Sequence, residues 1–151
     1  MGKKTVKILF FLYCIGMLWL MFGQRVRADR NGLPYWQAVS QHFNPIPFQT
    51  IRWFATVGNK TSNRYLLLHA FINLAGNVVM FIPLGGLLPA VWQKLGKFWK
   101  TLLMSAGIVL AAEVIQMLTL LGVCDVDDLI LNLLGVMVGY GLWKLTARRQ
   151  S

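Results

Sequence analysis

Four apolar runs of similar length limit what this 151-residue chain can fold into. Each run is close to the roughly 20 residues that an α-helix needs to cross a bilayer. The runs predict transmembrane helices over residues 6–22, 65–92, 101–121 and 129–145. Charged residues make up 13% of the chain, whereas a soluble domain usually carries about 25%. We therefore predict an all-α membrane protein, a single membrane domain over residues 1–151 built as a bundle of about four transmembrane helices.

The basic residues flank the apolar runs instead of forming a patch with interleaved aromatic residues. This arrangement is typical of membrane-flanking charge, and it argues against nucleic acid as a partner despite the net charge of +10. Nine of the fifteen Lys and Arg residues would share one side with the termini, and six would lie in residues 24–64. The positive-inside rule then places both termini in the cytoplasm. No small-residue cleavage site follows the first run, so we interpret residues 6–22 as a retained anchor helix.

The loop between the first two predicted helices, residues 24–64, mixes aromatic, basic and proline residues. Aromatic rings with a polar edge favour the membrane interface. The prolines in Asn44-Pro45-Ile46-Pro47 would break any helix at that point. We predict that this loop is extracytoplasmic and partly interfacial.

Polar side chains of three predicted helices fall at a similar depth, in the outer half of the membrane. At about 1.5 Å of rise per residue, this set comprises His69, Asn73, Asn77, Glu113, Gln116, Asp128 and Asn132. The cytoplasmic halves of the helices carry almost no such groups. An ionisable side chain inside a membrane costs several kcal/mol by insertion scales, which makes it a functional candidate by default.

Each of these features also has a purely structural interpretation. Asn73 and Asn77 would serve as interhelical hydrogen-bonding groups, and the Gly135-x-x-x-Gly139 spacing would serve close helix packing. Asp125 or Asp127 would cap the fourth helix and complement its dipole. Glu113 would be neutral and hydrogen-bonded, and His69 would extend its ring to the interface. Capping requires one aspartate, however, and three lie between residues 125 and 128.

A family pattern appears in the same residues. The stretch from Asn73 to Pro89, NLAGNVVMFIPLGGLLP, resembles the N-x-x-G-N-x-x-x-F-x-P-x-G signature of VanZ-like membrane proteins. EVIQ at residues 113–116, followed by DVDDLILNLLG at residues 125–135, resembles the second half of that signature, and NPIPF at residues 44–48 resembles its N-x-x-P-F loop. The motif maps onto Asn73, Gly76, Asn77, Phe81, Pro83, Gly85, Glu113, Gln116, Asp125, Asp128 and Asn132.

The resemblance implies a multi-pass protein of the bacterial cytoplasmic membrane, of a type linked to resistance against teicoplanin and related lipoglycopeptides. It also shows one departure. Many members have an arginine in an R-x-x-D arrangement before the first aspartate, where this chain has Gly122-Val123-Cys124-Asp125. If that arginine normally binds a phosphate or pairs with a carboxylate, another group must do so here, and the candidates are a divalent cation at Asp125 and Asp128 or, instead, Arg52 or Arg64.

Together, these patterns predict a polar pocket whose outer lip is formed by the three aspartates and whose floor is formed by Glu113, Gln116, Asn73 and Asn77. We expect the pocket to bind or modify a cell-envelope lipid, a lipid-linked cell-wall precursor or a glycopeptide target at the outer leaflet. The candidate ligand-binding residues are Asn73, Asn77, Gln116, Asp125, Asn132 and Arg52. A divalent cation between Asp125 and Asp128 is a candidate cofactor.

Two alternatives belong to other functional classes. A membrane-embedded enzyme would use Glu113 as general acid or base on a lipid-linked substrate, with Asp128 and His69 as catalytic partners. A structural protein would use the polar groups only to hold the bundle and would act through a partner protein. Sequence alone does not decide whether the protein is an enzyme.

Overall fold

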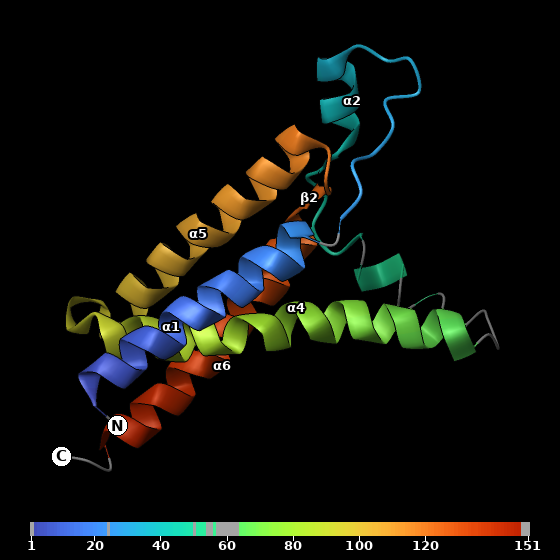
Figure 1. Ribbon diagram of the computed structural model, residues 1–151. Coiled ribbons are helices and arrows are strands. Elements are labelled where there is room, and N and C mark those ends of the chain that lie inside the picture. The colour runs from blue at the N-terminus through green and yellow to red at the C-terminus, as the bar shows by residue number, and fades with distance from the viewer. Residues whose placement is uncertain (1, 24, 50, 54–55, 57–63, 149–151) are drawn as a thin grey trace.

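Four long helices dominate the structure, which is a computed structural model. It describes residues 2–23, 25–49, 51–53, 56 and 64–148. The side chains at positions 64, 66, 67, 69, 70 and 148 are not described. The four helices are α1 (Lys3–Leu18), α4 (Arg64–Val91), α5 (Phe98–Thr119) and α6 (Val126–Arg148) (Figure 1). A short π-helix, η1 (Trp19–Gly23), directly continues α1. Within the described residues, four segments are long and apolar enough to cross a membrane: Lys3–Gly23, Phe71–Val91, Phe98–Thr119 and Val126–Ala147. The predicted all-α membrane fold is therefore confirmed.

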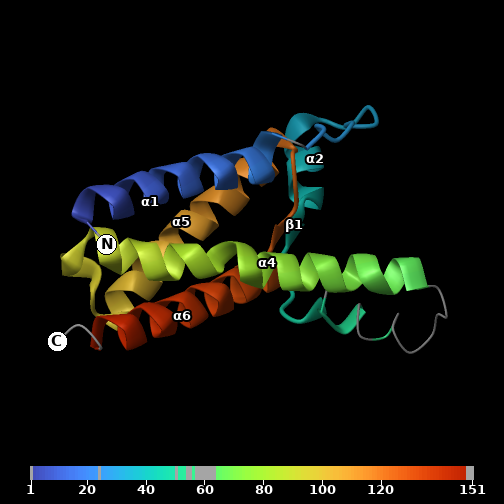
Figure 2. The same ribbon diagram turned by 60° about the horizontal axis from the view of Figure 1, so that its bottom comes forward.

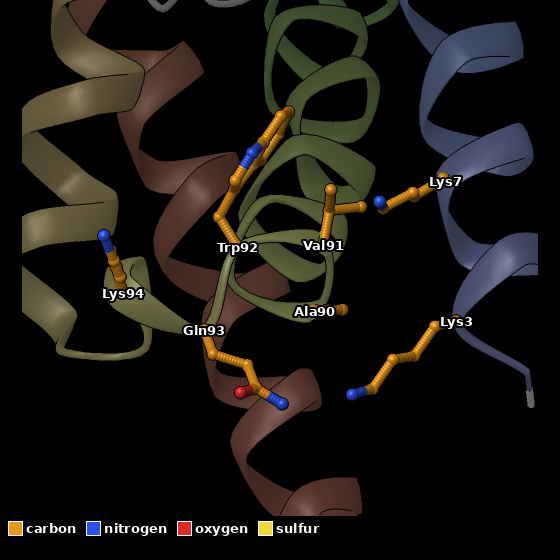
Figure 3. A pocket seen from close by; sticks show the side chains of 7 residues that line it. All are labelled: Lys3, Lys7, Ala90, Val91, Trp92, Gln93 and Lys94. Carbon is orange, nitrogen blue, oxygen red and sulfur yellow. The ribbon is translucent and has the colours of Figure 1, made fainter.

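The two ends of the bundle differ. The first turn of α1 and the last turn of α6 lie at one end, called the terminal end below (Figures 1 and 2). The short 3₁₀ helix η2 (Gln93–Leu95) connects α4 to α5 there, and Lys3 and Lys7 of α1 face the last turn of α4 (Figure 3). At the opposite end, called the loop end, lie the short helix α2 (Tyr35–Gln41) and the two-residue strands β1 (Phe43–Asn44) and β2 (Cys124–Asp125).

The loop between α1 and α4 is fastened to the turn between α5 and α6. Strands β1 and β2 pair in parallel, with Phe43 opposite Cys124 and Asn44 opposite Asp125. The backbone N–H of Cys124 donates to the carbonyl of His42 at 2.8 Å, and the N–H of Ala28 donates to the carbonyl of Leu120 at 2.8 Å. The described part of this loop thus covers the loop end of the bundle. Helix α2 ends at Gln41, ahead of the helix-breaking Asn44–Pro47 segment, as predicted.

Helices α4 and α6 pack with their backbones in direct contact. A Cβ added to Gly139 would lie 1.9 Å from the carbonyl oxygen of Ile82, and one added to Gly135 would lie 2.1 Å from that of Val78. On α4, a Cβ on Gly85 would lie 2.0 Å from the carbonyl oxygen of Val136. Only glycine permits helix axes this close. The structural interpretation of Gly135-x-x-x-Gly139 is therefore confirmed.

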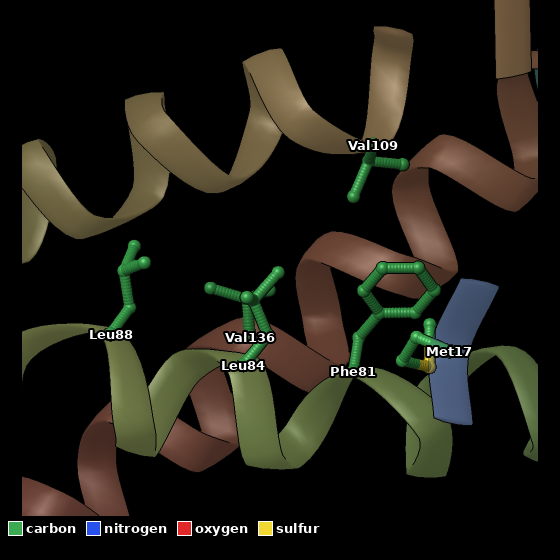
Figure 4. Close-up of a cluster of buried hydrophobic side chains, with 6 residues drawn as sticks. All are labelled: Met17, Phe81, Leu84, Leu88, Val109 and Val136. Carbon is green, nitrogen blue, oxygen red and sulfur yellow. The ribbon is translucent and has the colours of Figure 1, made fainter. Parts of the chain in front are cut away.

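A small apolar core joins all four long helices. Its buried members are Met17, Phe81, Leu84, Leu88, Val109 and Val136 (Figure 4). Many other large apolar side chains point outward, and α1 in particular exposes Phe11, Leu12 and Leu18. In water such a surface would be unfavourable, whereas lipid tails are as apolar as these side chains. The distribution of apolar residues therefore fits a bundle surrounded by lipid.

Candidate functional site

Asp125 caps α6 and holds the loop that precedes α4. Its Oδ1 accepts a hydrogen bond from the backbone N–H of Asp127 at 2.8 Å, which satisfies one of the free N–H groups in the first turn of α6. Its Oδ2 accepts from Nδ2 of Asn44 at 3.1 Å. Of the two aspartates predicted as helix caps, Asp125 is thus the one that performs this role.

Asp127 holds a distant backbone segment. Its side chain is completely buried, and its Oδ2 accepts from the N–H of Ile51 at 3.1 Å. Its Oδ1 accepts from the N–H of Phe48, a residue with a φ of 64° in the left-handed region. A non-glycine residue in that region is strained and persists only where its surroundings fix it. Asp127 therefore fixes the turn of the N-P-I-P-F segment, and its predicted capping of α6 is not its role.

Asp128 joins α6 to α4. Its Oδ1 accepts a hydrogen bond from Nδ2 of Asn77, so the two helices meet at this level through polar side chains as well as through the glycines nearer the terminal end. The three aspartates thus contact three different parts of the chain: Asn44, the 48–51 turn and Asn77. They form anchors and not the open lip of a pocket.

Glu113 lies on the buried face of α5. This face continues through Thr101, Ser105, Val109, Glu113 and Gln116, which are spaced three or four residues apart. The Glu113 side chain is 4% exposed, and Asp128, Asp125 and Arg25 are all within electrostatic range of its carboxylate. Within the described part of the chain, Oε2 of Glu113 has no hydrogen-bond partner, although buried polar atoms are normally paired.

Asn132 has a similar environment. It lies one helical turn after Asp128 on α6 and is 2% exposed. Its Oδ1 also finds no hydrogen-bond donor among the residues that the structure describes. Glu113 and Asn132 therefore contribute two buried acceptor atoms with unused capacity. We refer to Arg25, Asn77, Glu113, Asp125, Asp128 and Asn132 as the polar cluster.

Gln116, predicted to bind a ligand, is used in packing. Its Nε2 donates to the carbonyl of Met21 at 2.8 Å, which ties the end of the first span to α5. Its backbone carbonyl accepts from the N–H groups of Leu121 and Gly122, which closes the end of α5. One of the two N–H donors of its side chain therefore already serves packing within the protein.

Arg25 is the functional candidate that sequence reasoning missed. Its Nη1 donates to the carbonyl of Leu121 at 3.5 Å, and it is an electrostatic neighbour of both Glu113 and Asp128. A Cβ added to Gly122 would lie 2.6 Å from this Nη1. Gly122 is the position at which the R-x-x-D arrangement has its arginine, so Arg25 brings a guanidinium from a distant segment to the same place. The only sequence signal was the absence of an arginine at 122.

Two other predicted residues, Asn73 and Arg52, are exposed. Asn73 lies on α4, a helix that extends past the start of α6 at the loop end (Figure 2). Its role in ligand binding stays a prediction. Arg52 is exposed near the turn that Asp127 holds. The side chain of His69 lies outside the described residues.

The divalent-cation hypothesis gains no support from this arrangement. Across the described ranges, the structure has no group of three or more His, Cys, Asp or Glu side chains placed to hold a metal ion. Asp125 and Asp128 instead accept hydrogen bonds from Asn44 and Asn77. Both aspartates are thus engaged by neutral donors of the protein itself.

The four cavities described for this structure do not include Glu113 in their linings. One of them, of about 240 Å³ and lined by residues of α1, α4 and α5, reaches Val109 and Ala112 on the same helix as Glu113. Arg25 is exposed and Asp128 is half-buried, so the cluster meets the surface beside these two residues. Entry of a ligand would therefore begin at Arg25.

Cys124 offers a chemical test of the burial of the turn between α5 and α6. Burial raises the pKa of its thiol, and the carboxylates of Glu113 and Asp125 raise it further. Because the thiolate is the reactive form, we expect maleimide labelling of Cys124 in a Cys14→Ser protein to be about tenfold or more slower at pH 8 than that of an exposed thiol. The rate should continue to rise at higher pH.

The matched control for this labelling is the neighbouring residue. Val123 is 44% exposed, so Val123→Cys in a protein lacking both native cysteines places an accessible thiol one residue away. Equal labelling rates for the two thiols at pH 8 would show that the turn between α5 and α6 is open to solvent.

Comparison with known proteins places this arrangement in a family. A family model described as VanZ/LLP1 matches residues 10–147. Protein VanZ of Enterococcus faecium is 27% identical over 154 aligned positions, which cover 100% of this chain and 81% of that protein. No solved structure matches. Since the family model covers most of the chain, including α4, α5, the second half of α1, nearly all of α6 and the polar cluster, the chain belongs to the VanZ/LLP1 family of membrane proteins.

Proposed function

We propose that this protein resides in a bacterial cytoplasmic membrane with both termini inside, and that it binds the head group of a cell-envelope lipid or a glycopeptide target at the outer face. Family membership and four membrane-spanning helices support the setting. The terminal side, which would hold nine of the fifteen Lys and Arg residues, supports the orientation, because basic residues concentrate on the cytoplasmic side. Through this binding, the protein lowers susceptibility to teicoplanin and related lipoglycopeptides.

The observation that carries this proposal is the pair of buried acceptors, Glu113 Oε2 and Asn132 Oδ1, that find no donor among the described residues. Leaving a buried acceptor unpaired costs about 1–3 kcal/mol. A bound molecule that offers N–H or O–H donors removes this cost, whereas a bare phosphate offers acceptors only. The acceptors therefore favour the sugar, peptide or amine part of a head group, such as that of a lipid-linked cell-wall precursor.

Arg25 complements the acceptors. It is exposed at the edge of the polar cluster, and a guanidinium binds carboxylate and phosphate groups through paired N–H donors. An amphoteric head group would place its anionic part on Arg25 and its donors toward Glu113. In this arrangement Arg25 binds the anionic part of the head group, and Glu113 accepts hydrogen bonds from its donors.

Glu113→Gln tests the proposal with a change of almost no volume. We expect cells that produce the variant to lose at least about tenfold of any protection against teicoplanin, equivalent to about 1.4 kcal/mol of binding, at unchanged membrane abundance. The measurement is teicoplanin and vancomycin susceptibility in a Gram-positive host, with the protein quantified in membranes. Gly141→Ala, at an α6 glycine with open space around it in the described structure, is the control. Protection by Glu113→Gln equal to that of the wild type would contradict the role of the polar cluster.

A second experiment moves the positive charge. Arg25→Gln is expected to reduce protection, and Gly122→Arg in the same protein is expected to restore a large part of it, because position 122 lies beside the space that the Arg25 guanidinium fills. Gly122→Arg alone should be harmful, since it crowds Arg25. The idea would be abandoned if Arg25→Gln protected normally, or if Gly122→Arg failed to rescue a double variant of normal abundance.

One observation favours a second candidate function, a membrane-embedded enzyme. Glu113 and Asp128 are two carboxyl groups in electrostatic contact, and one oxygen of Glu113 carries no protein hydrogen bond in the described region. Paired carboxyl groups can transfer a proton to and from a substrate. Incubation of purified protein with lipid-linked precursor separates the two functions: an enzyme changes the mass of the lipid, and a binding protein returns it intact.

A further inference from the structure

A basic cavity occupies the terminal end of the bundle, far from the polar cluster. Its volume is about 400 Å³, and it is lined by Lys3 and Lys7 of α1 and by Trp92, Gln93 and Lys94 after α4 (Figure 3). The three ammonium groups come from segments almost 90 residues apart in the chain. The cavity therefore exists only because α1 packs beside the last turn of α4.

No acidic side chain balances these lysines within the lining. The five acidic residues of the chain are Asp29, Glu113, Asp125, Asp127 and Asp128. Asp29 lies in the loop that follows α1, and the other four lie between Glu113 of α5 and Asp128 in the first turn of α6, near the loop end. The terminal end thus carries an uncompensated positive charge, which attracts an anion.

Two apolar grooves continue from this basic cavity toward the middle of the membrane. One, of about 420 Å³, shares Trp92 and Lys94 with the cavity and runs between Phe10 and Met104. The other, of about 570 Å³, shares Ala90 and is lined by Leu9 and Leu142 among others. Because Phe10 and Leu9 are adjacent residues of α1, the two grooves pass on different sides of that helix.

This combination matches the chemistry of one class of molecule. A phosphodiester head group fits a cavity with three lysines and an amide, and two acyl chains fit two apolar grooves that begin at it. Basic pockets between transmembrane helices bind anionic lipid head groups, and a half-exposed tryptophan such as Trp92 is favoured at the head-group level. A soluble anion would use the lysines and leave the grooves unused.

We propose that the basic cavity binds an anionic phospholipid, with the phosphate at Lys3 and Lys7, the Lys94 ammonium on the other side of Trp92, and one acyl chain in each flanking groove (Figure 3). On the topology proposed above, this lipid belongs to the inner leaflet. It lies at the opposite end from the polar cluster, so its test is independent of the proposed activity at the outer face.

The experiment measures lipid binding by the purified full chain in a neutral detergent, by thermal unfolding and by native mass spectrometry. The probes are phosphatidylglycerol, phosphatidylcholine with the same chains, and glycerophosphoglycerol, which is the anionic head group without chains. The site variant is Lys3→Gln/Lys7→Gln/Lys94→Gln. The matched control is Lys97→Gln/Lys100→Gln/Lys144→Gln. It removes the same charge from the terminal end of the bundle, at lysines that do not line the cavity.

We expect phosphatidylglycerol to bind the wild type and the control variant and to raise their unfolding temperature, and phosphatidylcholine to do neither. Loss of three lysines should weaken phosphatidylglycerol binding on the order of a hundredfold. If the triple variant does not fold, Lys7→Gln alone should weaken binding about fivefold. Equal losses in site and control variants, or no preference for the anionic lipid, would overturn the proposal. Full stabilisation by glycerophosphoglycerol would assign the cavity to a soluble phosphodiester instead.

Discussion

Gly139→Ala is expected to separate α4 from α6 and to abolish most of the folded protein. The new Cβ would lie 1.9 Å from the carbonyl oxygen of Ile82 and 3.0 Å from the backbone nitrogen of Gly86. These are backbone atoms inside a helix, so neither can rotate away as a flexible side chain would. Overpacking a well-packed core costs about 1–3 kcal/mol, and a clash between two backbones should exceed about 3 kcal/mol. The polar contact between Asn77 and Asp128 would be lost with the packing.

Thermal unfolding in detergent and membrane abundance measure this effect. Gly141 on the same helix and Gly107 on α5 have open space around the position of an added Cβ in the described structure. Alanine at either position should leave stability unchanged or raise it by up to about 1 kcal/mol, because alanine favours helix over glycine. A Gly139→Ala protein as stable as Gly141→Ala would mean that α4 and α6 do not approach as closely as described.

Asp127→Ala is expected to detach the loop segment around Phe48 from the bundle and to lower the free energy of unfolding by about 3 kcal/mol or more. Two backbone N–H groups, those of Phe48 and Ile51, donate to this buried carboxylate. Hydrogen bonds to a charged group contribute about 1.5–3 kcal/mol each. The left-handed φ of Phe48 would also lose the contact that fixes it. Asp127→Asn should be less harmful, since its single amide oxygen can still accept one of the two bonds.

Proteolysis and thermal unfolding together report this change. The loop should become sensitive to protease at concentrations that leave the wild type intact, while the four spans remain protected by detergent. Asp29→Ala is the control, because Asp29 is exposed and accepts a local hydrogen bond from the N–H of Asn31 at 3.2 Å. Such a change should cost less than about 0.5 kcal/mol. Equal behaviour of the two variants would show that Asp127 does not anchor the loop.

The sequence was informative where the signal was local. Apolar length identified the four spans, and the Gly-x-x-x-Gly spacing identified the face on which α6 packs. Hydropathy misplaced the start of α6, which begins at Val126 and not at residue 129, because Asp127 and Asp128 in its first turn look like a loop. It also placed the end of α5 at residue 121, whereas Leu120 ends the helix with a left-handed φ of 59°.

The sequence was uninformative where distant segments meet through the backbone. Asp127 binds main-chain N–H groups 76 and 79 residues away, and a main-chain donor leaves no trace in side-chain pattern. Arg25 appeared to be one of several basic residues after the first helix until its contact with Leu121 placed it beside Glu113. Asn73 shared a helical stripe with Asn77, but a stripe does not reveal where the neighbouring helix begins. Periodicity predicts faces of a helix, and it does not predict which part of each face is covered.

The attachment of the loop to residues 120–128 has a consequence for biosynthesis. The ribosome makes residues 28–51 before it makes the partners that hold them, Leu120, Cys124 and Asp127. The face of α4 that carries Gly85 likewise has no packing partner until α6 has been synthesised. Until the last helix enters the membrane, the nascent protein therefore carries an unfastened loop and an unpaired helix face. A chain that stops before residue 126 should be a ready substrate for membrane quality-control proteases, and completion of the fourth helix should be the step that makes the product long-lived.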